Sequence, residues 1–544
     1  MAAAQFATGT DLDENLDTCV RMLDTAAAEG AELVVLPEFC NHISVYDDAE
    51  HCRAVAVPLD GPWLGTLAGR AAALGVYAAL AVTVPRPSGR TTATNVLVDP
   101  DGNVAVAADK QMLMGNERAF LSGGTGPTPI AGTPFGLLGL YSCMDGVTFE
   151  VPRTLAVRGA RLLLNSLNSF ARDEAALHIP VRAAENGVFV AAANKVGPLI
   201  PADRVQAFSE ALGVPTETFE GAGESQIVAP DGTVLAVGPA TGEAVVAAEV
   251  DLLATEPQRL RGRRPQVYAP LARPQTARPA EGLQAELTVA CVPGARGEPA
   301  LAPQAAAAGA QLVVLPELTP VPAAMPGGVL VVTTAMRGDS HVGQVWLDGR
   351  IVGEQPQVHR SERHPGATRL GETVELCRTP FGDLAVLVGD DHRYPETARL
   401  AATAGAHIVA VCWQPEHRWE TELGLVERAA ENRLVVAACA PPDAPKATMM
   451  CDPPADSLWN PNRSKPYDGT INMPAVVRAE PGCGLLLASL HPGRAVNREV
   501  SKDTDLVAGR PWQAAAVLAE AALAAKGPAA ASSPDSGRRE GVVC

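Results

Sequence analysis

Residues 33–38 read LVVLPE and place a glutamate just past a short apolar run. Residues 137–143 read LLGLYSC and place a cysteine at the end of a second run of this kind. Short continuous apolar runs predict strands that are buried on both faces, as in layered α/β folds. Ligands and catalytic groups in such layers gather beyond the carboxyl ends of the strands. The sequence therefore predicts an α/β fold that delivers Glu38 and Cys143 to one reactive site.

The chain contains one unit written twice. Several blocks recur in the same order, most of them at a constant offset of 246 residues. The offset between the two VVLPE blocks is 279, so the second copy is about 33 residues shorter between its glutamate and the later blocks. The missing piece corresponds to residues 61–74, which we predict to be a helix. The recurring blocks are RAAEN (182–186 and 428–432), TPFG (133–136 and 379–382) and VVLPE (34–38 and 313–317). Self-similarity of this kind indicates a duplicated structural unit.

We divide the chain of 544 residues into a first copy, a linker, a second copy and a tail. The first copy covers residues 1–270 and the linker covers residues 271–285, within a region rich in proline, arginine and alanine that begins near residue 261. The second copy covers residues 286–512. An alanine-rich helix and a disordered tail are predicted for residues 513–544, because the end of the tail has too little apolar surface to offset its chain entropy.

Composition and charge exclude several classes of function. The net charge of −18 argues against a nucleic-acid partner, whose phosphates require a basic surface. No apolar run approaches the roughly 20 residues that span a bilayer, and the N-terminus lacks a secretory signal pattern. Eleven cysteines without CxxC pairs favour reduced thiols and a cytoplasmic location. The ten histidines show no HxxxH or HxH spacing, so we expect neither a metal nor another cofactor.

The residues near the two strand ends predict a thiol chemistry. A thiol attacks well only as a thiolate or with a base that takes its proton, and no histidine pattern lies near Cys143. We therefore expect the Glu38 carboxylate to be the base. Lys110 is the only lysine between Glu38 and Cys143, and it could stabilise a developing oxyanion together with the backbone N–H of Met144. Glu117, seven residues further on, could hold the lysine in place.

These residues resemble the nitrilase superfamily of carbon–nitrogen hydrolases. The resemblance implies a four-layer αββα sandwich, present here as two tandem units, and an acyl-enzyme thioester that water cleaves. It also implies a catalytic set of Glu38, Lys110 and Cys143 with Glu117 as a second glutamate. The resemblance rests on LPE at 36–38, Lys110, Glu117, CMD at 143–145, Glu150, Arg153, RAAEN at 182–186, GES at 223–225 and RRP at 263–265. Many members have proline where this chain has Phe149.

The residues after the cysteine refine the functional prediction. Residues 143–146 read CMDG, which resembles the aliphatic amidase branch, whereas true nitrilases tend to have Cys-Trp-Glu. We therefore predict a thiol amidohydrolase that cleaves a non-peptide C–N bond of a small-molecule amide and releases ammonia or an amine. The alternatives are an N-carbamoyl hydrolase, a nitrilase and an enzyme that transfers the acyl group to an amine. A non-catalytic binding or scaffold protein is the alternative from another class.

The second copy lacks the reactive groups. The offset of 246 places Gly389 opposite Cys143, and no lysine occurs from residue 317 to residue 445. Anchoring Glu117 on Glu362 places Gln355 opposite Lys110. We therefore expect a non-catalytic second copy that pairs with the first as an internal pseudo-dimer, with a homo-oligomer as a further possibility. The alternative is a second copy that keeps a ligand pocket and acts as a sensor.

Overall fold

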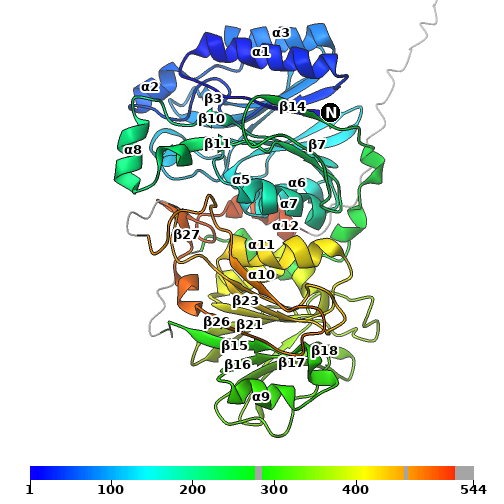
Figure 1. The fold of residues 1–544 in the computed structure, drawn as a ribbon. Helices are drawn as coiled ribbons and strands as arrows, with labels where there is room; N and C mark the ends of the chain where they lie inside the picture. The colour runs from blue at the N-terminus through cyan, green and yellow to red at the C-terminus, as the bar shows by residue number, and fades with distance from the viewer. Residues whose placement is uncertain (276–282, 284, 459–462, 521–544) are drawn as a thin grey trace, which may run out of the picture.

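The computed structural model describes residues 1–275, 283, 285–458 and 463–520. It consists of two layered α/β units stacked along one axis (Figure 1). Helices α1 and α3 cover one end of the stack and helix α9 covers the other, with four six-stranded sheets between them. The two tandem αββα units predicted from the sequence are confirmed. None of the helices in the described part of the chain has the length and apolar character needed to cross a lipid bilayer.

Two six-stranded sheets form the middle layers of the first copy. The two apolar runs form β2 and β7, and each pairs in parallel with neighbouring strands of its sheet. Both runs end beside the site described below. The outer sheet has the order β14 (Ala244–Ala247), β1 (Ala2–Gln5), β2 (Leu33–Val35), β3 (Tyr77–Pro85), β4 (Thr91–Val98), β5 (Val104–Asp109). The inner sheet has the order β13 (Val234–Val237), β12 (Gln226–Val228), β9 (Phe189–Ala193), β8 (Leu162–Ser166), β7 (Gly136–Ser142), β6 (Ile130–Thr133).

Helices cover both outer faces of the first copy. Its α-helices are α1 (Leu12–Ala28), α2 (Ala49–Ala54), α3 (Pro62–Leu74), α4 (Glu117–Phe120), α5 (Met144–Val147), α6 (Glu150–Val157), α7 (Ile179–Asn186) and α8 (Val205–Leu212). Helix α3 confirms the helix predicted for residues 61–74. A π-helical turn, η1 (Glu174–His178), precedes α7 directly. A short hairpin of β10 (Val196–Pro198) and β11 (Glu220–Ala222) lies outside the two sheets.

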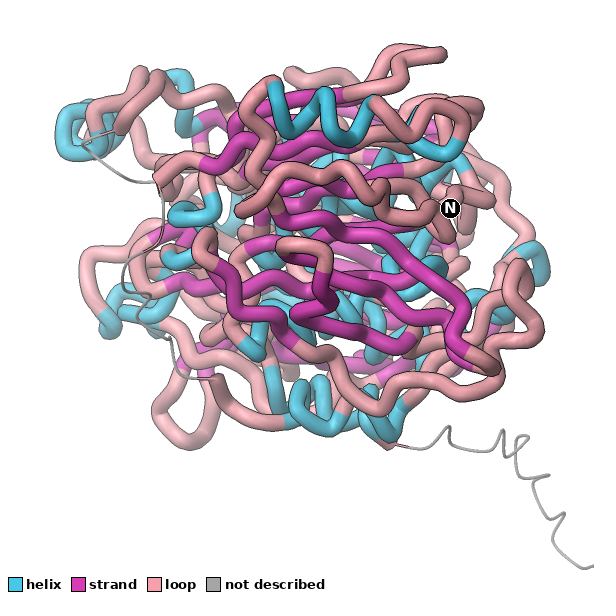
Figure 2. The backbone as a smooth tube through the Cα atoms, turned by 90° about the horizontal axis from the view of Figure 1, so that it is seen from below, coloured by secondary structure: helices cyan, strands magenta, loops and turns pink. Residues whose placement is uncertain are grey.

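The second copy repeats these layers without a counterpart of α3 among its described residues. One sheet has the order β19 (Arg350–Pro356), β18 (Ser340–Leu347), β17 (Leu330–Arg337), β16 (Leu312–Val314), β15 (Leu287–Cys291), β26 (Leu486–Leu490). The other has the order β20 (Leu376–Thr379), β21 (Gly382–Val388), β22 (Ile408–Cys412), β23 (Val435–Cys439), β24 (Met449–Asp452), β25 (Ala475–Arg478). Figure 2 shows strands of this copy lying side by side at its end of the stack. Its helices are α9 (Leu301–Ala307), α10 (Pro395–Ala404), α11 (Leu425–Asn432) and α12 (Trp512–Ala519).

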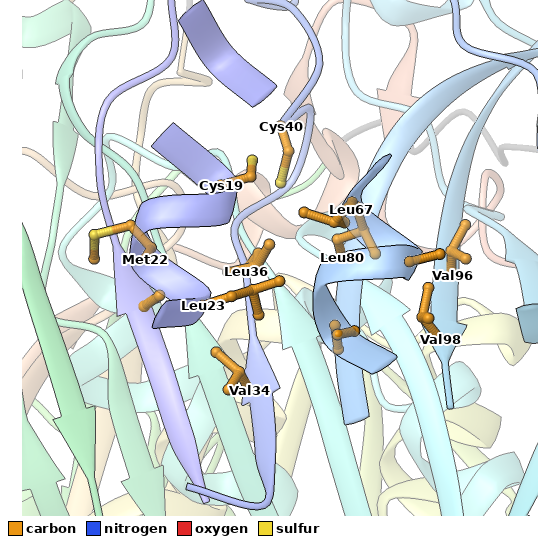
Figure 3. Close-up of a cluster of buried hydrophobic side chains, with 14 of the residues drawn as sticks. Cys19, Met22, Leu23, Val34, Leu36, Cys40, Leu67, Leu80, Val96 and Val98 are labelled. Atoms are coloured by element: carbon orange, nitrogen blue, oxygen red, sulfur yellow. The ribbon is translucent and has the colours of Figure 1, made fainter. Parts of the chain in front are cut away.

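Apolar side chains fill each space between layers. Figure 3 shows the layer between the outer sheet and helices α1 and α3, where Leu23 and Leu67 lie near Val34 and Leu80. A second cluster fills the space between the two sheets of the first copy, with Val35 on one side and Leu140 and Leu164 on the other. Apolar area removed from water stabilises a fold by roughly 25 cal/mol per Å². The continuous apolar runs of the sequence are therefore explained by sheets that are covered on both faces.

The two copies meet through helices α6 and α7 of the first copy and α10 and α11 of the second (Figure 1). Arg153 of α6 forms a bidentate ion pair with Glu396 of α10, with Nε 2.9 Å from Oε1 and Nη2 3.2 Å from Oε2. The same pair occurs in reverse, because Arg399 of α10 lies 2.9 Å from Glu150 of α6. These four residues are fully buried and are related in pairs by the offset of 246. Each copy therefore contributes the same two positions to the contact, as the two subunits of a two-fold interface do.

A second reciprocal set lies on α7 and α11. Arg182 Nη2 lies 2.9 Å from Glu431 Oε2 and also pairs with Glu427, while Arg428 pairs with Glu185. All of these residues are buried. The ion pairs of Arg182 with Glu427 and Glu431 and of Arg428 with Glu185 cross between the copies, whereas Arg182 also pairs with Glu185 of its own helix at 2.6 Å.

Part of the region predicted as the linker packs against the second copy. Residues Val267, Tyr268 and Leu271 are buried in an apolar cluster with Leu400 of the second copy. Arg263 Nε lies 2.8 Å from Glu396 Oε1. The segment from 261 to 272 is therefore part of the interface and not an open linker. Residues 276–282 and 284, and the tail beyond residue 520, lie outside the described residues, and so do the predictions made for them.

The buried charge of Glu396 predicts a pH dependence of stability. Burial alone would raise the pKa of Glu396, but the guanidinium groups of Arg153 and Arg263 outweigh it and lower the pKa to about 2. The folded pKa lies below the ordinary value, so this carboxylate stabilises the folded state above about pH 4.5 and loses that contribution as the pH falls to about 2. We expect Glu396→Gln to lower the free energy of unfolding at neutral pH by about 3 kcal/mol.

The gap between wild type and Glu396→Gln should close between pH 4.5 and pH 2, since both then carry an uncharged side chain at this position. Urea denaturation across this pH range measures the gap. A gap that stays constant down to pH 2 would show that the ion pair does not stabilise the fold through its charge.

Candidate functional site

Glu38 lies just beyond β2 and is held by the backbone. Its N–H donates to the Leu167 carbonyl at 3.0 Å, and the next residue, Phe39, has a φ of +54°. The left-handed conformation of Phe39 turns the chain away at the strand end and leaves the Glu38 carboxylate buried in the site. Its Oε2 atom has no hydrogen-bond partner among the described residues, which leaves that oxygen free to accept a proton.

Lys110 follows β5 and lies between two carboxylates. Its Nζ atom is 2.9 Å from Glu38 Oε1 and 2.9 Å from Glu117 Oε1. The backbone fixes the lysine on both sides, because Lys110 N donates to the Ala93 carbonyl and Lys110 O accepts from Gly124 N. Glu117 is itself held by an N–H from the turn before it, with Met114 N 2.9 Å from Oε2. The predicted pairing of Glu117 with the lysine is thus present in the structure.

Cys143 lies in a strained turn between β7 and α5. Its φ of +47° and ψ of −112° fall in a region that side-chain-bearing residues rarely adopt, at a cost of about 1–3 kcal/mol. The surrounding structure holds this conformation: Cys143 N donates to Asn165 Oδ1 at 3.2 Å, and Gly146 N donates to the Cys143 carbonyl at 2.7 Å. A sharp strand-to-helix turn of this kind presents a nucleophile at the top of a sheet.

Asp145 connects the cysteine turn to the lysine segment. Its carboxylate accepts N–H groups from Met112 at 2.7 Å and from Gln111 at 3.1 Å. Since Gln111 follows Lys110 directly, this carboxylate fixes the lysine relative to Cys143. The structure therefore brings together all four residues singled out in the sequence, namely Glu38, Lys110, Glu117 and Cys143. Their catalytic roles stay a prediction.

The electrostatics of the site favour a protonated thiol beside a basic carboxylate. Burial raises the pKa of Cys143 well above its usual value, and the Glu38 charge raises it further. Burial also raises the pKa of Glu38, although the Lys110 ammonium opposes this effect. Burial alone would lower the pKa of Lys110, but the carboxylates of Glu117 and Glu38 outweigh it and raise the pKa well above its usual value. The lysine is therefore a fixed positive charge, and Glu38 is a stronger base than an exposed carboxylate.

Glu174 was not singled out in the sequence but lies close enough to act on the site. It begins the π-helical turn η1 and is 1 % exposed, and neither of its carboxyl oxygens has a hydrogen-bond partner among the described residues. Burial raises the pKa of Glu174 to about 8. When Glu174 is ionised, its negative charge raises the pKa of the Cys143 thiol. Single turns of π-helix occur frequently at functional sites. In the sequence alone Glu174 looks like an ordinary residue in the first turn of a helix.

The second copy reproduces the backbone of the site without its reactive groups. Leu318 has a φ of +56° after Glu317, as Phe39 does after Glu38, and Gly389 has a φ of +55° at the position of Cys143. A Cβ atom on Gly389 would lie only 2.8 Å from Glu317 Oε1. The described structure thus has no thiol at this position and no room for one while Glu317 keeps its conformation.

The structure corrects the sequence alignment at the lysine. Gln357 N donates to the His341 carbonyl, and Gln357 O accepts from Gly371 N, which reproduces the two backbone bonds of Lys110. Gln357 therefore replaces Lys110, and the predicted counterpart Gln355 is wrong by two residues. The counterpart of Glu117 is then His364 and not Glu362. Glu362 lies in a loop, whereas the register of the second copy is fixed by strand pairing, which the sequence does not show.

The second copy also supports the site of the first copy directly. Gly115, two residues before Glu117, donates its N–H to Thr504 Oγ1 at 2.9 Å. Thr504 belongs to a small hairpin of β27 (Glu499–Ser501) and β28 (Thr504–Asp505). Met112 and Met144, which flank the lysine and the cysteine, pack against second-copy apolar residues. The second-copy members of this cluster are Ile471, Val500 and Leu506.

Residues 1–259 and 330–444 match the sequence profile of the carbon-nitrogen hydrolase family. The chain belongs to the carbon-nitrogen hydrolase family. The predicted membership of the nitrilase superfamily is thus confirmed, and the second matched segment falls in the second copy.

Individual relatives correspond to about half of this chain. It is 27% identical over 249 residues to a nitrilase of Pyrococcus abyssi, covering 46% of this chain and 87% of the relative. It is 27% identical over 299 residues to the deaminated glutathione amidase of Mus musculus, covering 50% of this chain and 86% of the relative. A solved amidase from Nesterenkonia sp. is 26% identical with a TM-score of 0.39, covering 48% of this chain and 94% of that one.

Gly389→Ala should destabilise the protein by about 1–3 kcal/mol, because the position has a left-handed φ and the new Cβ would meet the Glu317 carboxylate. Gly65→Ala is the matched control: Gly65 lies on the exposed side of α3 with nothing within 4 Å of the added Cβ, so this change should be neutral or stabilising. Chemical denaturation of both variants measures the difference. Equal stability of the two variants would contradict the left-handed conformation of Gly389 and its close approach to the Glu317 carboxylate.

Proposed function

We propose that the first copy hydrolyses a non-peptide C–N bond of a small amide through a thioester on Cys143 and releases ammonia or an amine. The observation that carries the proposal is the Lys110 ammonium, fixed 2.9 Å from both Glu38 and Glu117 beside a cysteine in a strained turn. A base, a fixed positive charge and a thiol are the parts that such an acyl transfer requires.

In the acylation half of the proposed reaction, Glu38 takes the thiol proton as Cys143 Sγ attacks the carbonyl carbon. The high pKa of both groups makes this transfer simultaneous with attack, because a free thiolate would be unfavourable in the buried site. Lys110, with the backbone N–H of Met144, stabilises the negative charge on the former carbonyl oxygen. The C–N bond then breaks, and the leaving amine takes the proton from Glu38.

In the deacylation half, Glu38 takes a proton from water as the water oxygen attacks the thioester carbon. The C–S bond breaks, the acid leaves, and the thiol regains its proton from Glu38. Glu117 holds Lys110 in place throughout, since its own Oε2 is fixed by Met114 N. The same base therefore serves both halves without any change in position.

We further propose that Glu174 contacts the substrate. Its carboxyl group is buried, unpaired among the described residues and, with a pKa of about 8, protonated at neutral pH. A protonated carboxyl has one donor and one acceptor, which match the carbonyl and N–H of a carboxamide group. This match supports an amide substrate. The second copy differs here, because its counterpart Glu420 is paired with Arg393 at 2.7 Å.

A nitrilase or an N-carbamoyl hydrolase is the second candidate for the same site. The similarity to a nitrilase of Pyrococcus abyssi supports it, whereas the sequence CMDG after the strand supports an amidase.

We propose that the second copy is non-catalytic and serves as an internal partner of the first. The ten cysteines within the described residues are free thiols, which supports a reducing, cytoplasmic setting.

Cys143→Ala should abolish ammonia release from every substrate of the wild-type enzyme, because it removes the nucleophile. Cys377→Ala, which changes a partly exposed thiol on β20 of the second copy, is the matched control and should retain full activity. Purified protein tested against a panel of small amides, ureas and nitriles, with ammonia and product as readouts, gives the comparison. Residual turnover by Cys143→Ala above that of buffer would overturn the assignment of the nucleophile.

Glu174→Met should raise KM for an amide substrate about tenfold, as expected for a lost hydrogen bond of about 1.4 kcal/mol, and leave kcat much less affected. Methionine is similar in length to the uncharged glutamic acid side chain and is readily buried, so the fold should persist. Steady-state kinetics separates the two constants. A loss confined to kcat, with KM unchanged, would show that Glu174 acts in the chemistry and not in binding.

A further inference from the structure

Three potential metal ligands meet in the second copy at the position of the lost site. Glu317, His341 and His364 offer one ligand atom each, and these atoms all lie within 4.8 Å of one another. His364 Nε2 is 3.1 Å from Glu317 Oε1, and His341 Nδ1 is 3.8 Å from the same oxygen. The two imidazole rings lie edge to face with centroids 4.5 Å apart. From this geometry we propose a Zn²⁺ site with Glu317, His341 and His364 as its ligands.

The distances suit zinc with little rearrangement. Tetrahedral zinc with bonds of about 2.0–2.1 Å separates its ligand atoms by about 3.3 Å. The separations of 3.1 and 3.8 Å from Glu317 Oε1 to the two histidine nitrogens lie on either side of that value, and the nitrogens lie within 4.8 Å of each other. Two histidines and one glutamate form a known zinc ligand set that leaves a fourth position open. Imidazole ligands suit zinc, whereas the softer Cu(I) ion prefers thiolate and thioether ligands.

The neighbouring groups orient the ligands. His341 Nε2 lies 2.8 Å from Thr334 Oγ1, which fixes the ring. Nδ1 lies 3.8 Å from Glu317 Oε1 and 2.9 Å from Gln357 Oε1, so zinc would take the place of the Gln357 contact at this nitrogen. Arg363 Nη1 binds Glu317 Oε2 at 2.5 Å, which leaves Oε1 for a metal. Supporting contacts of this kind hold metal ligands in place and fix the histidine tautomer. The positive charge of Arg363 is matched by a second pair, with Asp390 Oδ1 2.5 Å away.

The substitutions that remove the hydrolase site also create this one. Gln357 replaces Lys110, and His341 lies at the strand position that Ala93 occupies in the first copy, as the matching backbone bonds show. His364 lies seven residues after Gln357, as Glu117 lies seven residues after Lys110. Gly389 replaces Cys143 and is required by the Glu317 conformation, because a Cβ atom would lie 2.8 Å from Oε1. The second copy has therefore lost its lysine and thiol and gained two imidazoles around the retained glutamate.

The site can be reached from solvent. The side chains of His364 and Arg363 are 15 % and 17 % exposed, whereas His341 is fully buried behind them. An ion can therefore arrive at His364 and Glu317 first and then complete its coordination with His341. The ion-pair network that includes Glu317 also has more carboxylates than guanidinium groups, which favours a divalent cation. Its carboxylates are Glu317, Asp390, Glu416 and Glu420, and its guanidinium groups are Arg363 and Arg393.

The test is Zn²⁺ binding by the full-length protein, measured by isothermal titration calorimetry and by metal content after dialysis. All proteins carry Cys143→Ala, so that zinc bound by the thiol of the first copy is not counted. We expect one equivalent of Zn²⁺ in this background. His364→Ala and Glu317→Gln should each weaken binding by at least about 100-fold. His417→Ala, which changes an exposed histidine of the second copy, is the matched control and should bind as the parent does.

Two outcomes would overturn the proposal: no zinc bound by the parent, or equal affinity in the parent and in both ligand variants. Circular dichroism of each variant shows whether the fold is intact. If a ligand variant fails to fold, an anomalous difference map at the zinc edge, from crystals of the parent grown with ZnCl₂, decides the question by placing the ion at these three residues or elsewhere. Ammonia release plays no part in this test, so its result is independent of the proposed hydrolase activity.

Discussion

The structure depends on one buried guanidinium group, that of Arg182. It donates to the carbonyls of Gly146 and Val147, which lie in the short helix directly after Cys143. It also pairs with Glu427 and Glu431 of the second copy. One side chain therefore ties the turn that carries the thiol to the opposite copy. Breaking a buried pair of this kind typically costs about 3–5 kcal/mol, because an uncompensated charge is left behind.

This connection gives a physical reason for a second copy without a nucleophile. The reciprocal pairs between Arg153 and Glu396 and between Arg399 and Glu150 have the form of a two-fold contact within one chain. The hairpin that contains Thr504 supports the loop of Glu117, and second-copy apolar residues pack under Met112 and Met144. The strained conformation of Cys143 persists only where surrounding structure imposes it, and part of that structure comes from the second copy.

Much of the fold and the proposed hydrolase site could be predicted from the sequence because both follow from local patterns. Apolar runs gave the buried strands, and Glu38 and Cys143 stand at the ends of two of them. Other features depend on packing between distant segments. The predicted counterpart of Lys110 was two residues from Gln357, because strand pairing and not loop similarity sets the register. Glu174 is noticeable only once its carboxyl is seen to be buried without a partner, and Glu317, His341 and His364 have no spacing that predicts a shared site.

The proposed mechanism requires a thioester at Cys143, which covalent trapping can detect. Wild-type protein is mixed with a slowly hydrolysed amide, quenched in acid during turnover, and analysed by intact mass spectrometry and peptide mapping. We expect one added acyl group, located on the peptide that contains Cys143. An acyl group on a peptide without Cys143, or turnover with no adduct under conditions where hydrolysis of a thioester is slow, would contradict it.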